Sequence, residues 1–118
     1  MPKRRREYYN ICEIKPSTQR VDIVVTVIKK QSIKTFNKGE ETHRVGEFLV
    51  GDRTGIIILV IWDDLIDLIN ERETYIIKNL RPKIYKNQLR VIGTKDSEVN
   101  ISPHKIPINQ INTSPKLR

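Results

Sequence analysis

The sequence predicts an all-β domain, a small five-stranded barrel with one short helix between the third and fourth strands. Two apolar runs in residues 48–62, separated by Gly51-Asp52-Arg53-Thr54-Gly55, carry this prediction. Gly and Asp supply the backbone conformations that a hairpin turn requires. The second run, Ile56 to Trp62, contains seven apolar residues and no polar one. That strand must therefore have apolar surroundings on both sides.

The first half of the barrel is expected to hold two strands before this turn. Residues 21–28 alternate apolar and polar side chains at period two, which indicates a half-buried strand. Residues 34–41 contain Asn37-Lys38-Gly39 and are predicted to form a loop, followed by a strand over residues 43–50. Gly46 interrupts the alternation of that strand and suggests a β-bulge.

The second half is expected to begin with the helix. Residues 63–69 have apolar side chains at helical spacing, and acids in the first turn favour the positive end of a helix dipole, so a two-turn helix fits. Strands over residues 74–80 and 88–92 follow, joined at residues 81–87 by a loop or a twisted hairpin end. Val99 and Ile101 are candidates to extend the last strand.

The chain is expected to divide into three parts: a basic N-terminal arm over residues 1–12, the barrel over 13–101, and a flexible, proline-containing tail over 102–118. The arm carries Lys3-Arg4-Arg5-Arg6. This run has the form of a nuclear import signal, and an arm that grips phosphate would look the same. We expect a nuclear location if the source is eukaryotic and a cytoplasmic one otherwise.

Several functional classes are disfavoured by the composition. Cys12 is the only cysteine and is accompanied by only His43 and His104, so the usual four ligands of a zinc site cannot be assembled. No apolar run approaches the roughly 20 residues of a membrane span. We expect a soluble, intracellular protein with no cofactor, no metal and no membrane association.

A metal-dependent nuclease is the enzymatic alternative, because acids gather at Asp63, Asp64, Asp67, Glu71 and Glu73. Two-metal chemistry needs carboxylates that converge on one cavity, and helix capping with a solvated face explains these residues more simply. No histidine, serine or cysteine constellation supports nucleophilic catalysis. The sequence therefore predicts a protein that is not an enzyme and has no catalytic residues.

The formal net charge of +8 indicates a polyanionic partner. The charge is segregated, because residues 74–95 contain only basic charged side chains, whereas residues 63–73 contain five acids and only Arg72. The basic residues of this stretch are Lys78, Arg81, Lys83, Lys86, Arg90 and Lys95.

Three strands, a short helix and two strands form the element order of the OB fold, a Greek-key barrel that binds oligonucleotides. Ile14-Lys15-Pro16, residues 50–55, Trp62-Asp63-Asp64 and Tyr85-Lys86 resemble the simple single-stranded DNA-binding proteins of archaea. They equally resemble the B subunit of the eukaryotic sensor-of-single-stranded-DNA complex, itself similar to the OB domains of replication protein A. The resemblance runs from about residue 13 to residue 92.

The resemblance implies that DNA bases stack on Trp62 and Tyr85 while basic side chains follow the phosphates. Two positions depart from the family pattern: Arg81 stands where an aromatic is usual, and Ile92 where the eukaryotic members carry one. A guanidinium can still stack on a base. Phe36 is either a third stacking platform or a hydrophobic plug. The candidate phosphate contacts are Lys34, Lys78, Lys83, Lys86 and Arg90.

The resemblance also places Ile57, Leu59 and Ile61 inside the barrel, so that Ile56, Ile58 and Val60 face outward with Trp62. An exposed apolar stripe more often marks a protein interface than a nucleotide site. We expect it to meet a partner subunit, a second copy or the chain's own tail.

The leading hypothesis is a single-stranded DNA-binding protein with little sequence preference, acting in replication or repair. An interaction subunit that assembles a larger complex is the second hypothesis. RNA binding is the third, because stacking and phosphate contacts do not read the sugar.

Overall fold

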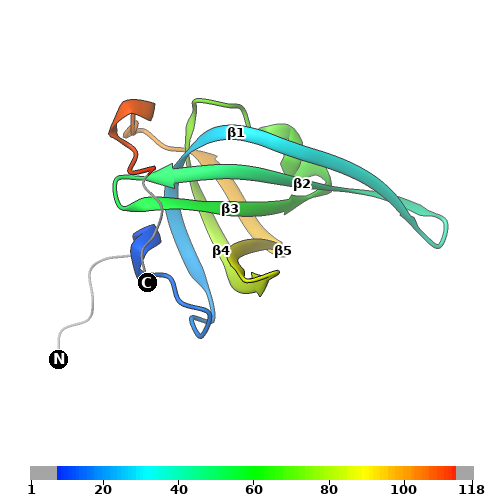
Figure 1. Cartoon of the computed structure of the whole chain (residues 1–118). Coiled ribbons are helices and arrows are strands. Elements are labelled where there is room, and N and C mark those ends of the chain that lie inside the picture. Colours follow the sequence, from blue (N-terminus) through cyan, green and yellow to red (C-terminus); the bar gives the residue numbers. More distant parts are fainter. Residues whose placement is uncertain (1–7, 114–118) are drawn as a thin grey trace.

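The computed structural model describes residues 8–113, which form one closed β-barrel (Figure 1). Its strands are β1 (Val21–Lys38), β2 (Glu41–Asp52), β3 (Gly55–Trp62), β4 (Thr74–Tyr85) and β5 (Gln88–Ile101), in the spatial order β1-β2-β3-β5-β4. Short 3₁₀ helices occur at η1 (Ile11–Glu13), η2 (Asp63–Leu68) and η3 (Ile108–Gln110). The predicted five-stranded barrel, with a short helical element between the third and fourth strands, is confirmed.

The core is filled by alternate side chains of the strands, as the period-two pattern requires. On β3 the buried core residues are Ile57, Leu59 and Ile61, as the family resemblance implied. They pack with side chains from every other strand and from η1 and η2; these include Val21, Ile23, Val25, Phe48, Ile66, Tyr75, Ile77, Leu80 and Val91. The parity that faces Trp62 outward is therefore set by the core.

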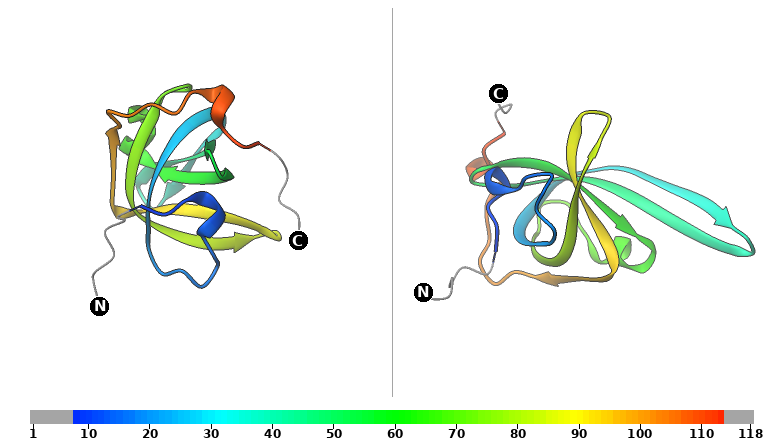
Figure 2. Two further views of the ribbon diagram at one scale, coloured as in Figure 1. Left: turned by 90° about the vertical axis from the view of Figure 1, so that its left-hand side faces the viewer. Right: turned by 90° about the horizontal axis from the view of Figure 1, so that it is seen from below.

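The first two strands continue beyond the barrel as a two-stranded ribbon, visible on the right of Figure 1 and in the right-hand view of Figure 2. Pairing between β1 and β2 persists out to Lys38 and Glu41, and only Gly39 and Glu40 form the turn. The prediction of a loop over residues 34–41 is therefore wrong. Lys, Asn and Gly suggested a loop, but cross-strand pairing outweighs the weak strand propensity of these residues.

The prediction of a bulge at Gly46 is also wrong. The register shifts lie in β1, between Val27 and Lys29 and between Lys30 and Ser32, whereas Gly46 pairs regularly with Ile33. A Cβ atom on Gly46 would lie 2.9 Å from Cε1 of Phe48. Glycine is present here because the Phe48 ring packs directly against the strand backbone.

The helix and the second hairpin differ from their predicted bounds. Residues 63–68 form a 3₁₀ helix instead of two α-helical turns, and Asp63 begins it with a positive φ of 51°. Residues 81–85 belong to β4, because the turn to β5 contains only Lys86 and Asn87. Both have positive φ, 52° and 65°, as a type I′ hairpin turn requires. Val99 and Ile101 extend β5, as anticipated.

The N-terminal arm packs onto the barrel over its described part. Ile11 is buried in the core, and its N–H donates to Oδ2 of Asp52 at 3.0 Å. The domain therefore begins before residue 13, our predicted boundary. The run Lys3-Arg4-Arg5-Arg6 lies outside the described residues.

The C-terminal segment also packs onto the barrel instead of forming a flexible tail from residue 102. Thr26 Oγ1 donates to the Ile106 carbonyl at 2.7 Å, and the Ile106 N–H donates to Thr74 Oγ1 at 3.0 Å. Farther on, the Asn112 N–H donates to the Asp52 carbonyl at 3.1 Å. Residues 102–113 thus form a strap across β1, β2 and β4. Within residues 8–113, no helix is long and apolar enough to cross a membrane.

Candidate nucleic-acid interface

Trp62 and Phe36 form an aromatic pair where the ribbon leaves the barrel. Trp62 ends β3 and Phe36 comes from β1, and their ring centroids lie 6.0 Å apart at an interplanar angle of 79°. Each residue is 38% exposed. Because the rings meet edge to face, the flat surfaces of the pair are not used up by mutual stacking. These surfaces suit a base, which stacks on an aromatic face.

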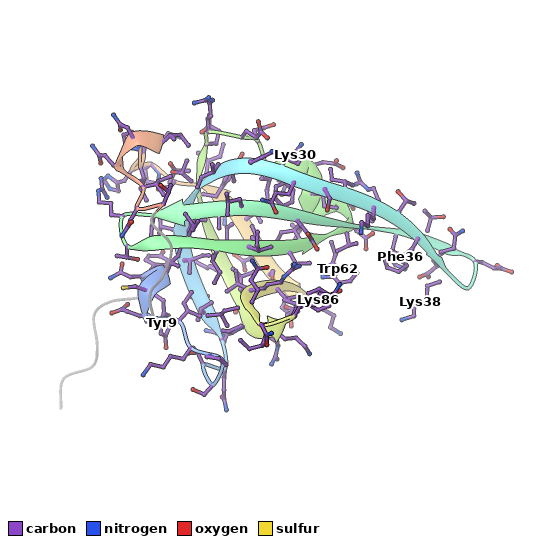
Figure 3. The ribbon with its side chains drawn as sticks, viewed as in Figure 1. Tyr9, Lys30, Phe36, Lys38, Trp62 and Lys86 are labelled. Carbon is purple, nitrogen blue, oxygen red and sulfur yellow. The ribbon has the colours of Figure 1, made fainter. Side chains whose placement is uncertain are left out.

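The pair lines an open groove of ≈ 690 Å³, hereafter the Trp62 groove. Lys38 lines it from the ribbon and Lys95 from β5, and two acids, Asp63 and Asp64, line it from η2. Figure 3 shows Phe36 and Lys38 on the ribbon, with Trp62 at the neighbouring end of β3. Lys34, Phe36 and Lys38 alternate along β1 and therefore share one face of the ribbon. The groove thus combines stacking surfaces with two lysines that can follow phosphates, and its acids lie at the η2 end.

His43 supports the Phe36 side of the groove. Its ring centroid lies 5.7 Å from that of Phe36. Nδ1 lies 3.0 Å from Oδ2 of Asp63, and Nε2 lies 3.1 Å from Oε1 of Glu41. Two hydrogen bonds raise the pKa of His43: the larger effect comes from Asp63 and the smaller from Glu41. The His43–Asp63 hydrogen bond also lowers the pKa of Asp63. Protonated His43 therefore ties the ribbon to the start of η2.

We expect this link to make stability depend on pH in the neutral range. The folded-state pKa of His43 is raised, so its contribution is fully present below the unfolded value of about 6.5 and is lost as pH rises through the folded value. The melting temperature should therefore fall as pH rises from about 6.5, the unfolded value, through the raised folded-state pKa of His43. In His43→Gln this fall should be smaller, measured by thermal melts across that range. Equal pH dependence in the two proteins would contradict the assignment.

The outer face of β3 is crossed by an ion pair. Arg90 Nη1 on β5 lies 2.8 Å from Oε2 of Glu47 on β2, and the Arg90 side chain is only 15% exposed. In the sheet register Arg90 is level with Ile58, and Glu47 is opposite Val60. The pair therefore passes over the outward side chains of β3, and both of these apolar residues are only 6% exposed.

The expectation of an exposed apolar stripe at Ile56, Ile58 and Val60 is therefore wrong for the latter two. At the third position the chain covers itself, because Ile56 Cγ2 and Ile111 Cγ2 both lie within 3.1 Å of the place where a Cβ on Gly51 would stand. Ile111, from the segment predicted to be a tail, therefore lies at one end of the stripe. The burial of Ile58 and Val60 removes the exposed surface on which the prediction of a partner interface rested at those two positions.

Tyr85 lies at the tip of the β4–β5 hairpin and is 49% exposed. The guanidinium carbon of Arg90 is 4.7 Å from the centre of its ring, and Lys86 Nζ is 5.3 Å from it. The ring is thus held by cation–π contacts but keeps an exposed side. Arg90 is already engaged by Glu47 and Tyr85, so it is not a freely available phosphate contact.

The remaining predicted basic residues do not gather into one groove. Lys78 pairs across the sheet with Glu98, an acid, on the part of β4 beyond the irregularity at Asn79. Arg81 and Lys83 line a separate hollow together with Arg20. Of the basic residues that were predicted to bind phosphate, only Lys34 lies on the face of the ribbon that carries Phe36. Sequence alternation was misleading because the break in register between Lys78 and Leu80 changes which side chains of β4 share a face.

Four residues that matter here were not predicted: Lys38, His43, Glu47 and Lys95. Lys38 and His43 could have been found had residues 34–41 been taken as strand. Alternation from Phe36 leads to Lys38, and His43 lies opposite Phe36 in the paired strand. Glu47 and Lys95 become relevant only through pairing between distant strands. Within residues 8–113, no group of three or more His, Cys, Asp or Glu side chains is placed to hold a metal.

Comparison with known proteins gives a family match over most of the barrel. Residues 14–101 match the family described as single-stranded DNA binding protein Ssb-like, OB fold. The uncharacterized protein At4g28440 of Arabidopsis thaliana is 27% identical over 99 residues, covering 75% of this chain and 65% of that protein. This chain therefore spans slightly less than two thirds of the length of that relative.

Solved structures share the architecture. The replication factor A related protein of Methanobacterium thermoautotrophicum has a TM-score of 0.72 at 18% identity, covering 87% of this chain and 96% of that one. A chain of a replication protein A heterotrimer bound to single-stranded DNA has a TM-score of 0.71 at 19% identity, covering 91% of this chain and 27% of that one. At such identities the likeness shows the fold alone, and the predicted OB fold is confirmed.

Proposed function

We propose that this chain, which belongs to the Ssb-like, OB-fold family of single-stranded DNA-binding proteins, functions by binding nucleic acid. Proteins of this family are binding proteins and not enzymes, and the membership supports binding of single-stranded nucleic acid in general. Within that class, the chain is proposed to bind single-stranded DNA with little sequence preference. It would protect or mark the strand during replication or repair.

One observation carries the proposal: the half-exposed Trp62–Phe36 pair lies in a groove whose lining includes Lys38 and Lys95, with Asp63 and Asp64 at its η2 end. Stacking on aromatic rings tolerates any base, because every base has a flat π face. Lysine side chains neutralise phosphate without reading sequence. Tyr85, with its exposed ring, would offer a further stacking surface at the hairpin tip.

A role in replication or repair is also part of the proposal. A solved structure of similar fold is a replication protein A heterotrimer bound to single-stranded DNA, and another is a replication factor A related protein. These support replication or repair as the setting. In a eukaryotic cell the proposed role would require a nuclear location, for which Lys3-Arg4-Arg5-Arg6 would serve as the import signal.

The direct test is quenching of Trp62, the only tryptophan in the chain, by oligo-dT. We expect saturable quenching whose affinity falls with a slope of about −2 to −4 in log salt, since each phosphate contact on a single strand contributes about 0.7. Phe36→Leu should weaken binding while leaving the quenching measurable. Absence of quenching at low salt would reject the proposal. Competition by a matched oligo-rU decides between DNA and RNA.

A further inference from the structure

We propose that the protein has a second phosphate-binding site outside the Trp62 groove, which takes the sugar–phosphate backbone where the strand passes the β4–β5 hairpin. The inference rests on the proposed function and concerns an open hollow of ≈ 880 Å³ between the loop of residues 16–20 and residues 81–83 of β4. Its charged lining residues are Arg20, Arg81 and Lys83, and we name it the Arg20 hollow.

The hollow is basic and no acid lines it. Within residues 8–113, none of these three side chains makes an ion pair or a hydrogen bond. Among the other arginines of residues 8–113, Arg44 is engaged with Asp67, Arg53 with Gln110 and Arg90 with Glu47, whereas the exposed side chain of Arg72 has no such partner. Unpaired guanidinium groups retain all their donors, and their planar fork matches the oxygens of a phosphate. The hollow therefore has the chemistry of a phosphodiester site.

The walls of the hollow are held in place by the fold. The Thr18 N–H donates to the Lys15 carbonyl at 2.9 Å, and the Lys15 N–H donates to Thr18 Oγ1 at 3.2 Å. These bonds close the turn that precedes Arg20. On the other wall, residues 81–85 are paired with β5. Less loop ordering is then required on binding, which favours affinity.

The hollow lies where β1 and β4 separate from each other. Pairing of β1 with β4 ends at Val21 and Leu80. Beyond Leu80, β4 continues with β5 as its only described strand partner, while the chain before Val21 turns away as the 16–20 loop. The left-hand view of Figure 2 shows this loop below the hairpin. Backbone phosphates could approach the edge of β4 here.

The hollow is continuous with the face that carries Tyr85. Arg81, Lys83 and Tyr85 alternate along β4, and Lys83 lies opposite Arg90 in the register. A strand with bases on Trp62 and Phe36 would cross the Arg90–Glu47 ion pair, reach Tyr85 and then meet the Arg20 hollow. The hollow therefore engages only strands long enough to extend that far.

This length requirement defines the experiment. Labelled oligo-dT strands from about 4 to about 16 nucleotides, the range of OB-fold site sizes, are titrated by anisotropy into the full chain and into Arg20→Gln. We expect equal affinity for the shortest strands and roughly three- to fivefold weaker binding of the longest by the variant, as for exposed ion pairs. The salt slope for the longest strand should shrink by about 0.7.

Arg72→Asn is the matched control, because it removes another unpaired, exposed arginine and Asn tolerates the positive φ of 74° at that position. We expect it to match the wild type at every length. If Arg20→Gln also matches the wild type at every length, or weakens short and long strands equally, the second site is rejected. Trp62 quenching by short strands reports separately on the proposed function, whose failure would remove quenching in both proteins.

Discussion

Replacement of Trp62 by alanine is expected to weaken binding of oligo-dT by about 5- to 150-fold, because stacking of one base on an aromatic contributes about 1–3 kcal/mol. Trp62 is 38% exposed at the edge of the Trp62 groove and touches Phe36 edge to face. Its loss removes the larger stacking surface and also the support for Phe36. Since the variant lacks the only tryptophan, affinity is measured by anisotropy of a labelled oligonucleotide.

Leu68→Ala is the control for this experiment. Leu68 is a 51% exposed apolar residue on the neighbouring helix η2, so its removal tests whether loss of any surface hydrophobe near η2 weakens binding. We expect no change in its affinity. Trp62→Phe should retain part of the binding, because a smaller aromatic can still stack. Wild-type affinity in Trp62→Ala, with the barrel still folded by circular dichroism, would reject the stacking role.

Asp52→Ala is expected to lower the free energy of unfolding by about 3 kcal/mol, because a hydrogen bond to a charged group contributes about 1.5–3 kcal/mol. Asp52 is 6% exposed. Its Oδ1 accepts from Thr54 N and Oγ1 at 2.7 and 2.6 Å and from Gly55 N at 3.1 Å, while Oδ2 accepts from Ile11 N at 3.0 Å. Urea unfolding followed by Trp62 fluorescence measures the loss.

Asp52→Ala should lower the free energy of unfolding by more than the removal of an ordinary surface acid does. Asp96→Ala is the control, since Asp96 is exposed and only its backbone groups are bonded; surface changes of this kind usually stay within about 0.5 kcal/mol. Asp52→Asn should be intermediate, because an amide keeps one acceptor oxygen but introduces donors beside N–H groups. An Asp52→Ala protein as stable as Asp96→Ala would show that the turn and η1 hold without this carboxylate.

Local sequence was informative wherever a strand contacts the core. The alternation of residues 21–28 and the apolar run ending at Trp62 correctly predicted strands, because a half-buried strand alternates and a strand covered on both faces is apolar throughout. It was less informative beyond the core. Residues 34–41 were expected to be a loop but are largely paired strand, since there the hydrogen bonds of the partner strand determine the conformation. For residues 81–87, a loop and a hairpin end were both considered, and the hairpin end is the one present.

The candidate site could be predicted from the sequence only in part: the position of Trp62 could be predicted, and the contacts of Arg90 could not. Trp62 faces outward because Ile57, Leu59 and Ile61 fill the core, and the family resemblance had implied this placement. Arg90 could not be assigned from its neighbours in sequence. Its partner Glu47 lies 43 residues away and reaches it across β3, so a residue expected to bind phosphate is instead held in an ion pair.

The amino-acid sequence by itself determined the barrel and the net positive charge, because periodicity and composition are local properties, and its family resemblance implied the outward position of Trp62. Tertiary structure alone decided which cations are available. Pairing between distant strands engages Arg90 with Glu47, and the departure of β1 from β4 leaves Arg20 with Arg81 and Lys83 in one hollow. It also decided that Ile58 and Val60 are covered. Those outcomes depend on register, which no single segment specifies.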